Sequence, residues 1–291
     1  MSKNDESNYQ NALQTYLQET KNTNPIGIFD SGIGGLTVAY AVKELLPHEQ
    51  IIYFGDTAHL PYGEKSTAAL QAYSIKAVDF LLKHHCKVIL FACNSASSAA
   101  FELIKEYTAT KAKVIDVIQP VVNYVANRFE GKNIGLIGTR QTINSNAYLQ
   151  KIDKTNKNIN LSSVATPLLA SMIEEGFFNN TISKSVISEY LSDESLQNIE
   201  GLILGCTHYP LIKKDIDLFF QENFSQKVEI IDGSFIVAEE VRIFLEQNNL
   251  LNPHSTKEDV FYVSDLTKSF EETTKIFFRK KVELELYKLW E

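Results

Sequence analysis

Two cysteines follow short apolar runs in matching contexts and are the residues best suited to chemistry in this sequence. Cys93 follows the run VILFA and Cys206 follows the run GLILG, and two small or polar residues come directly after each. Two thiols in equivalent positions form a symmetric pair of acid/base groups. Inversion of a C–H stereocentre requires such a pair, because one group removes a proton from one face and the other returns a proton to the opposite face. The pattern therefore predicts a reaction that inverts a carbon centre.

Both cysteines are expected at the start of a helix, where a thiol loses its proton more readily. An unperturbed thiol has a pKa of about 8.5 and is a poor base at neutral pH. The helix dipole and the unpaired backbone N–H groups favour the thiolate, so we expect Cys93 and Cys206 to be stabilised in that form. Cys86, on the approach from a helix to a strand, is interpreted as a small buried hydrophobe.

Polar residues beside the cysteines and in a glycine loop are candidate helpers. Asp30 follows a strand and precedes the loop, where its carboxylate can accept backbone N–H bonds or transfer a proton. We interpret Ser31 as the helix cap and Asp30 as the chemical helper. His208, two residues after Cys206, is expected to tune that thiol or to bind a substrate.

The same glycine loop leaves a nucleotide site as a minor alternative. Gly32, Gly34 and Gly35 do not complete G-x-G-x-x-G, because Thr37 stands in the third place. Asp56 nevertheless follows the next strand, about 20 residues on, as a ribose-binding acid would. A zinc site, a P-loop and a serine hydrolase are disfavoured, since C-x-x-C, G-K-[ST] and G-x-S-x-G are all absent from the sequence.

Composition narrows the class of protein. The chain has 291 residues, of which 36 are acidic and 28 basic, and the net charge of −8 argues against a nucleic-acid partner. Three cysteines and a polar stretch over the first 20 residues predict a reducing, cytoplasmic environment. No apolar run approaches the roughly 18 residues that would span a membrane, so we expect no membrane partner.

Short apolar runs alternate with helical stretches after Pro25, which predicts an α/β fold with mostly parallel sheets flanked by helices. The expected strands cover residues 26–29, 51–54, 88–91, 114–117, 134–137, 161–165, 202–204 and 228–231, followed by a strand at 260–263, a helix at 266–278 and an alternating segment at 282–289. A ligand in such a fold binds beyond the carboxyl ends of the strands, which is where the candidate residues lie.

A weak internal repeat predicts two similar lobes. The segment IGIFDS at residues 26–31 resembles IGLIGT at 134–139 at an offset of 108, and the two cysteines are 113 apart. Nearly equal offsets indicate lobes related by a pseudo-twofold axis, with one thiol in each lobe and the active site in the cleft between them. We expect a flexible extension at 1–24, a first lobe at 25–117 plus 228–291, and a second lobe at 118–227.

Four motifs together resemble the successive signatures of glutamate racemases, within the aspartate/glutamate racemase family. The motifs are DSGxGG from Asp30, GDT from Gly55 with PYGEKS from Pro61, ACNSA from Ala92, and LGCTHYP from Leu204. They occur in the order and spacing of that family, from about Pro25 to the C-terminal region. The resemblance implies a cofactor-independent racemase that uses no metal and that supplies D-glutamate for peptidoglycan synthesis. Members commonly form dimers, so a homodimer is one option.

The resemblance also implies roles for individual residues. Cys93 would act on the D enantiomer with help from Asp30, and Cys206 on the L enantiomer with help from His208 and Glu174. Because Glu175 adjoins Glu174, the sequence leaves open which glutamate assists. Substrate contacts would come from Asp30, Ser31, Tyr62, Gly63, Asn94, Ser95, Thr207 and His208. Ser95 stands where the family usually has Thr and retains the hydroxyl.

The residues agree with an anionic substrate in a dry site. Glutamate has two carboxylates, yet Lys65 is the one Lys or Arg residue in the four motifs. Backbone N–H groups at helix N-termini, together with hydroxyl and amide side chains, can bind carboxylates without a cation. Two alternatives stay open: a related racemase acting on aspartate or a hydantoin, and a small-ligand binding module without catalysis.

Overall fold

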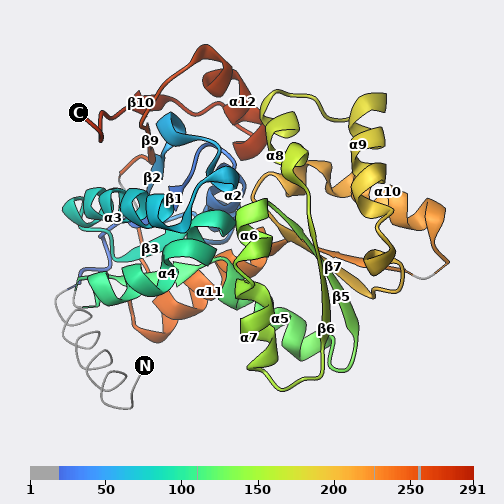
Figure 1. Cartoon of the computed structure of the whole chain (residues 1–291). Helices are drawn as coiled ribbons and strands as arrows, with labels where there is room; N and C mark the ends of the chain where they lie inside the picture. The colour runs from blue at the N-terminus through green and yellow to red at the C-terminus, as the bar shows by residue number, and fades with distance from the viewer. Residues whose placement is uncertain (1–19, 110, 226, 255–256) are drawn as a thin grey trace.

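The computed structural model describes residues 20–109, 111–225, 227–254 and 257–291 of the chain (Figure 1). The expected flexible extension at 1–24 therefore lies almost entirely outside the described residues. Within the described part, no helix is both long and apolar enough to cross a membrane.

Two parallel sheets form the framework, which confirms the predicted α/β fold of two lobes. The first sheet has the order β10 (Leu284–Leu286), β9 (Val260–Val263), β2 (Ile51–Gly55), β1 (Ile26–Asp30), β3 (Val88–Phe91) and β4 (Lys113–Asp116). The second has the order β6 (Asn160–Ala165), β5 (Asn133–Gly138), β7 (Gly201–Gly205) and β8 (Glu229–Ile231). All described strand pairs are parallel. Figure 1 shows the two sheets side by side.

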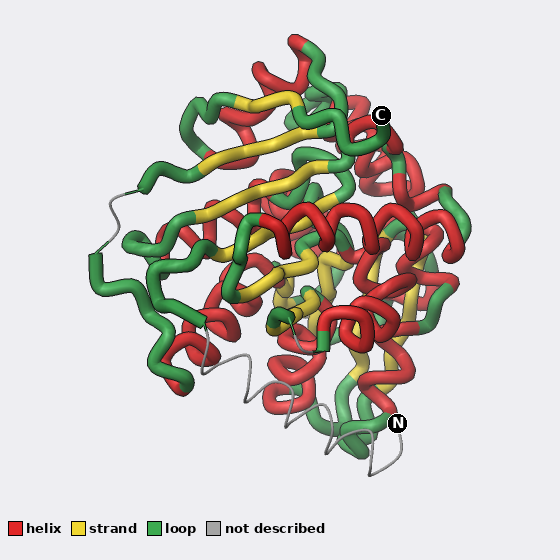
Figure 2. Tube along the Cα trace, turned by 90° about the vertical axis from the view of Figure 1, so that its left-hand side faces the viewer, coloured by secondary structure: helices red, strands yellow, loops and turns green. Residues whose placement is uncertain are grey.

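Helices cover both faces of the first sheet, as Figure 2 shows. They are α2 (Leu36–Leu45), α3 (Thr67–Lys83), α4 (Asn94–Thr108) and α11 (Gly233–Gln247), with α12 (Lys268–Phe278) packed on α2. Around the second sheet lie α6 (Arg140–Asn144), α7 (Ala147–Asp153), α8 (Pro167–Glu174), α9 (Thr181–Leu191) and α10 (Lys213–Asn223). Helix α5 (Ile118–Arg128) packs against α11 of the first lobe and α7 of the second. Short 3₁₀ turns complete the chain: η1 (Thr57–His59), η2 (Tyr62–Glu64), η3 (Glu194–Leu196) and η4 (Tyr209–Ile212).

The two sheets repeat one strand order, which gives the predicted internal repeat a structural meaning. The order β2-β1-β3-β4 in the first sheet corresponds to β6-β5-β7-β8 in the second. Strand β1 thus corresponds to β5, and β3 to β7, as the offsets of 108 and 113 require. Cys93 and Cys206 follow the corresponding strands β3 and β7, so the fold presents both thiols from equivalent positions.

One predicted boundary is wrong. The strand at 228–231 was expected in the first lobe, but β8 pairs with β7, with Leu202 opposite Ile230. The second sheet needs this strand as the counterpart of β4, which covers the outer edge of β3 in the first sheet. The chain then returns, because α11 packs against α2 and α5, and β9 pairs with β2.

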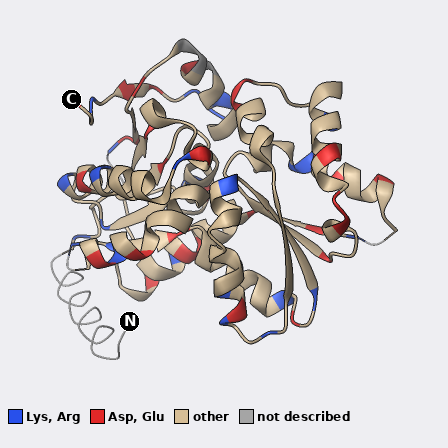
Figure 3. Ribbon diagram, in the orientation of Figure 1, with Lys and Arg blue, Asp and Glu red and all other residues tan. Residues whose placement is uncertain are grey.

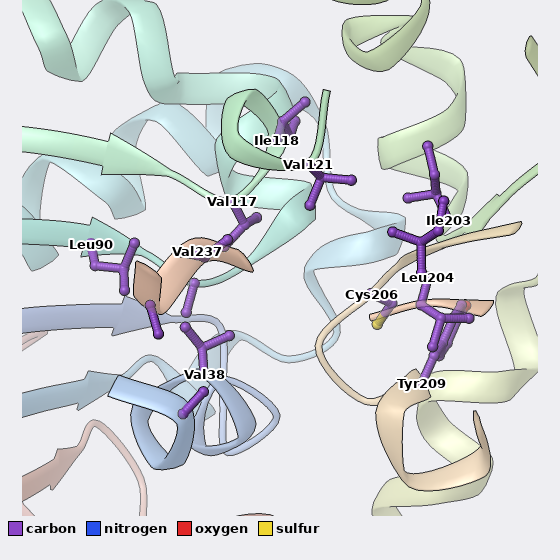
Figure 4. Packing of buried hydrophobic residues seen from close by; sticks show 14 of the residues in the cluster. Val38, Leu90, Val117, Ile118, Val121, Ile203, Leu204, Cys206, Tyr209 and Val237 are labelled. Carbon is purple, nitrogen blue, oxygen red and sulfur yellow. The ribbon is translucent and has the colours of Figure 1, made fainter. Parts of the chain in front are cut away.

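The hydrophobic core divides into two clusters. The larger one runs through both lobes and includes Val38 and Val237 beneath the first sheet as well as Ile203 and Leu204 of β7. Figure 4 shows these residues, with Cys206 beside Leu204. The smaller cluster fills the opposite face of the first sheet under α3 and α4 and contains Cys93. A core shared between the lobes fixes the carboxyl ends of both sheets relative to each other.

A buried ion pair fastens the chain behind β3. Lys87 and Glu49 are 0% and 1% exposed, and Nζ lies 2.6 Å from Oε2. Lys87 also donates to the carbonyl of Leu250 at 2.8 Å, and Glu49 accepts from the backbone N–H of Asn252 at 2.8 Å. The pair thereby ties the start of β3 to the segment that follows α11.

Replacing Lys87 by Met should lower the free energy of unfolding by about 3–5 kcal/mol, because it leaves the Glu49 carboxylate buried without its cation. Urea unfolding measures the change. The double variant Lys87→Met, Glu49→Met should recover much of the loss, and Lys83→Met, at an exposed position of α3, should change stability by less than about 0.5 kcal/mol. Equal losses in the single and double variants would contradict this account.

Candidate functional site

A small cavity of about 60 Å³ lies where the carboxyl ends of the central strands of both sheets meet. Both cysteines line it. So do most of the other candidates, namely Ser31, Tyr62, Gly63, Asn94, Ser95, Glu174, Thr207 and His208. Asp30 does not line the cavity and is fully buried behind it. The tertiary structure therefore brings together candidates from distant parts of the sequence. Ser31 and His208, for example, are 177 residues apart.

Cys93 caps the N-terminus of α4, and its environment differs from the one expected. Its Sγ accepts from the backbone N–H of Ala96 at 3.4 Å and donates to Oγ of Ser31 at 3.5 Å. Burial raises the pKa of this thiol to about 12, and the nearby carboxylate of Asp30 adds to the rise. The contacts with Ser31 and Ala96 favour the thiolate but are outweighed. The helix N-terminus thus favours the thiolate of Cys93 as expected, but burial and Asp30 have the larger effect on the pKa.

Asp30 ends β1 and is held by the glycine loop. Its Oδ1 accepts from the backbone N–H of Gly32 at 2.9 Å. Burial raises the pKa of this carboxyl group, against the opposing influence of His208. A Cβ at Gly35 would lie 2.5 Å from the Cβ of Asp30, so only glycine permits this close approach. Gly35 is also the N-cap residue of α2, so the interpretation of Ser31 as the helix cap is wrong.

Cys206 belongs to a chain of three side chains. Its Sγ lies 3.5 Å from Nδ1 of His208, and Nε2 of His208 lies 2.9 Å from Oε1 of Glu174. Burial by itself lowers the pKa of His208, but Glu174 and Cys206 outweigh it and the pKa is raised well above its usual value. A protonated imidazole donates from both ring nitrogens, so it can donate to the sulfur and the carboxylate at once. Glu175 is exposed at the end of α8.

The segment after Cys206 is not the α-helix that was expected. The 3₁₀ turn η4 begins at Tyr209, and α10 begins only at Lys213. Pro210 lies in the first turn of η4, where its missing N–H removes no hydrogen bond. The two thiols thus have different surroundings: Cys93 has helix N–H groups, and Cys206 has an imidazole.

Thr139 lines the cavity and was missed by the sequence reasoning. Its Oγ1 lies 2.8 Å from Oγ of Ser95, and a Cβ at Gly63 would come within 2.7 Å of its own Cβ. Thr139 follows β5 as Ser31 follows β1, so the repeat at an offset of 108 could have identified it. The other lining residues outside the candidate set are Leu60, Pro61, Glu64, Pro167, Ala170 and Ser171.

Close contacts between the lobes hold the cavity in shape. A Cβ at Gly34 would lie 2.4 Å from Cε1 of His208, so the glycine loop can approach the second lobe only without a side chain. Thr37 donates to the carbonyl of Thr207 at 3.0 Å. Tyr148 of the second lobe donates to Oδ1 of Asn94 at 2.8 Å, which fixes the amide that follows Cys93.

The dinucleotide alternative finds no support, because Asp56 is already occupied. Its carboxylate is fully buried and accepts from Oη of Tyr62 at 2.6 Å, from Oγ of Ser264 at 2.7 Å and from Nε1 of Trp290 at 2.9 Å. The group holds protein side chains rather than facing a cleft where a ribose could bind.

The described lining of the cavity contains no Lys or Arg, and His208 supplies its one basic side chain. Lys65 is not among the lining residues. Figure 3 shows that basic and acidic residues are scattered over the helices and loops. The polar groups that line the cavity are therefore mainly hydroxyl groups, the amide of Asn94, the carboxylates of Glu64 and Glu174, and the imidazole of His208.

The raised pKa of Cys93 predicts slow alkylation. With a pKa of about 12, about one molecule in 10⁴ carries the thiolate at pH 8, so iodoacetamide should label Cys93 about 10³-fold more slowly in the folded than in the urea-unfolded chain. Peptide mass spectrometry at pH 7–10 measures both rates. The folded rate should rise about tenfold per pH unit throughout. A rate that levels off above about pH 9, as expected for an ordinary thiol with a pKa of about 8.5, would contradict the raised pKa.

Comparisons with known proteins assign the chain to a family. A family model for Asp/Glu/Hydantoin racemases matches residues 37–241. The glutamate racemase of Chlorobaculum parvum is 41% identical over 254 residues, which cover 87% of this chain and 92% of that protein. The glutamate racemase of Neisseria meningitidis is 39% identical over 260 residues, with 89% and 94% covered.

Solved structures give the same assignment. The crystal structure of the Francisella tularensis glutamate racemase in complex with D-glutamate superposes with a TM-score of 0.85 at 41% identity, covering 92% of this chain and 99% of that one. The aspartate racemase of Picrophilus torridus, with a TM-score of 0.54 and 17% identity over 78% of this chain and 99% of that one, shares the fold alone. The chain therefore belongs to the aspartate/glutamate/hydantoin racemase family and is an isomerase.

Proposed function

We propose that this chain interconverts L- and D-glutamate by a two-base mechanism without a cofactor. The observation that carries the proposal is the presence of two thiols in one small cavity, each following the equivalent strand of its own sheet. The relatives at 39–41% identity are named glutamate racemases, and one of the solved structures contains D-glutamate. Together these favour glutamate over aspartate or a hydantoin.

In the proposed reaction the two thiols exchange roles at each turnover. The thiolate of Cys93 removes the α-proton of D-glutamate, and the thiol of Cys206 delivers its proton to the opposite face of the same carbon. The product is L-glutamate, with Cys93 now protonated and Cys206 now a thiolate. The reverse direction begins from that state, so charge and protons balance in both directions.

The contacts of the two sulfurs suit these roles differently. A thiolate at Cys93 would be stabilised by the N–H of Ala96 and the hydroxyl of Ser31, which already lie at hydrogen-bond distance. A thiolate at Cys206 would be stabilised by protonated His208, which Glu174 holds in place. Asp30 is proposed to assist Cys93 from behind the cavity, since its charge raises the pKa of that thiol and so strengthens the base.

Substrate carboxylates are proposed to bind without a cation. Asn94 and Ser95 begin α4, where free N–H groups and the positive end of the helix dipole face the cavity. Thr207 and Thr139 add hydroxyl groups from the second lobe. Fixed donors in a dry cavity also stabilise the carbanion-like transition state without solvent reorganisation.

The proposal includes a cellular role. We propose that D-glutamate made by this reaction enters peptidoglycan synthesis and that the enzyme works in the cytoplasm. The three cysteines of the described structure are free thiols, which is compatible with a reducing compartment. A homodimer is proposed from the family resemblance, and light scattering of the purified chain would measure it.

Removal of either thiol should stop racemisation. Cys93→Ala and Cys206→Ala should each lower the rate in both directions by about 10³-fold or more, because one face of the α-carbon loses its proton donor or acceptor. Circular dichroism of D-glutamate without added cofactor measures the rate. In D₂O the wild type should place deuterium at Cα of the product enantiomer.

Cys86→Ala is the matched control, because Cys86 is buried under the first sheet, away from the cavity, and its loss should leave the racemisation rate within about twofold. Full activity in both directions after loss of Cys93 or Cys206 would reject the two-base mechanism. Protection of the thiols by glutamate without any racemisation would favour a binding module instead, and faster turnover of aspartate would favour the related racemase.

The neighbouring glutamates provide a sharp test of the relay. Glu174→Gln should lower racemisation by about 10²-fold, because one of the two groups that raise the pKa of His208 is lost while burial still opposes protonation. Protonated His208 would consequently disappear at a lower pH, and the rate should decline at a lower pH than in the wild type. Glu175→Gln, at the exposed neighbouring position, should leave rate and pH profile unchanged, and identical effects of the two variants would exclude the relay.

A further inference from the structure

A buried carboxylate links the active-site cavity to the C-terminal segment. Asp56 follows β2 and is fully buried, yet it lines no part of the cavity. Its Oδ2 accepts from Oη of Tyr62, which does line the cavity, at 2.6 Å. Its Oδ1 accepts from Oγ of Ser264 at 2.7 Å and from Nε1 of Trp290 at 2.9 Å. One carboxylate thus joins a cavity residue to two residues from the far end of the sequence.

The indole of Trp290 is fixed by more than this hydrogen bond. Its ring meets His59 edge to face, with centroids 4.3 Å apart, and Tyr73 in the same way at 5.2 Å. His59 also contacts the Asp56 carboxylate, with Nδ1 2.9 Å from Oδ2. The charged Nζ of Lys76 lies 4.6 Å above the indole ring, where a cation is attracted to the π-electrons. The orientation of Trp290 is therefore determined from several sides.

The segment that carries Trp290 is itself attached to the first sheet. Strand β10 pairs with β9, and the backbone N–H of Tyr287 donates to the carbonyl of Val263 at 2.8 Å. Ser264 accepts from the backbone N–H of Ala58 at 2.9 Å. Figure 1 shows the red C-terminal segment on the same side of the molecule as blue β2. The loop between β2 and α3 is thereby held by chain segments about 208 residues away.

These contacts decide how Tyr62 is presented. The side chain is 2% exposed and its hydroxyl hydrogen is directed to Asp56, so Tyr62 cannot move away from its position without breaking this buried hydrogen bond. Loss of the Trp290 donor would leave Oδ1 of Asp56 with fewer partners in a buried place, and the carboxylate would shift to regain them. Tyr62 and the adjoining Gly63 would move with it.

We propose that Trp290 is a positioning residue for the active site, acting through Asp56 to hold Tyr62 against the substrate. This inference rests on the proposed function and adds to it a structural requirement from a segment outside the cavity. Trp290 does not line the cavity, and its hydrogen bond to Asp56 links it to Tyr62, so its effect should fall mainly on substrate binding. The environment of Trp290 should also change when a ligand binds next to Tyr62.

The kinetic test replaces Trp290 by Phe, which keeps an aromatic ring and removes the N–H donor. We expect KM for D-glutamate to rise about 5- to 10-fold with kcat changed less than about twofold, while thermal unfolding stays near that of the wild type. The matched control is Tyr287→Phe, which alters the same segment without touching Asp56 and should leave KM unchanged. An unchanged KM in Trp290→Phe would overturn the inference.

A double-mutant cycle shows whether the effect passes through Tyr62. In a Tyr62→Phe background the Trp290→Phe change should alter KM by less than about twofold, because the linking hydroxyl is already absent. An undiminished effect in that background would show a merely structural role for Trp290 and would also overturn the inference.

Fluorescence provides a readout that needs no turnover. Trp290 is the only tryptophan in the sequence, so intrinsic emission reports on this position alone. Titration of the wild type with D-glutamate should change the emission saturably, and Tyr62→Phe should remove that change. If the wild type racemises glutamate but its emission does not respond, the positioning role fails while the proposed function stands. If the emission responds without racemisation, the proposed function fails and the link between cavity and Trp290 stands.

Discussion

Burial of two ionisable thiols in one cavity is the constraint on which the rest of the structure depends. Both side chains are shielded from solvent, so each charged state of a sulfur must be stabilised by groups that the fold holds in place. Cys93 is 5% exposed and Cys206 is 7% exposed. Burial raises the pKa of Cys93 and so makes its thiolate a stronger base, which suits the proposed removal of a weakly acidic α-proton. The same burial requires fixed hydrogen-bond donors, which the loops after the central strands supply.

The repeated strand order presents the two thiols from equivalent positions of the two lobes. Local differences between the lobes give each thiolate its own kind of stabilisation. Both thiols follow the third strand of a 2-1-3-4 arrangement, one in each sheet. Each belongs to a different hydrophobic cluster: Cys93 to the smaller cluster of the first lobe, and Cys206 to the core shared by both lobes. Asp30 has Gly138 as its counterpart in the second lobe, whereas the imidazole of His208 has Ser95 as its counterpart two residues after Cys93. Inversion requires opposed groups, and the surroundings of those groups need not match.

Much of the fold could be predicted from the sequence because its strands are short apolar runs bounded by glycine, proline and polar residues. All eight expected strands and the later strand at 260–263 were found within one or two residues of their expected bounds. The sheet to which β8 belongs could not be predicted, since strand pairing depends on where α11 returns, and α11 packs on helices that lie more than 100 residues earlier. The site likewise could be predicted only in part. Motifs located Cys93 and Cys206, but the contact of Thr139 with Ser95 arises only when the two lobes meet.

The sequence by itself determined which groups can do the chemistry: two thiols at equivalent strand ends, with Asp30, His208 and Glu174 as candidate helpers. The tertiary structure decided their states and partners. It placed Asp30 behind the cavity, raised the pKa of Cys93, joined His208 to Glu174 rather than Glu175, and connected Tyr62 to Trp290 through Asp56. The physical reason is that strand and helix patterns depend on near neighbours in the chain. Desolvation, charge and hydrogen bonding depend on what surrounds a group in space, and in this protein that environment comes from both lobes and from the C-terminal segment.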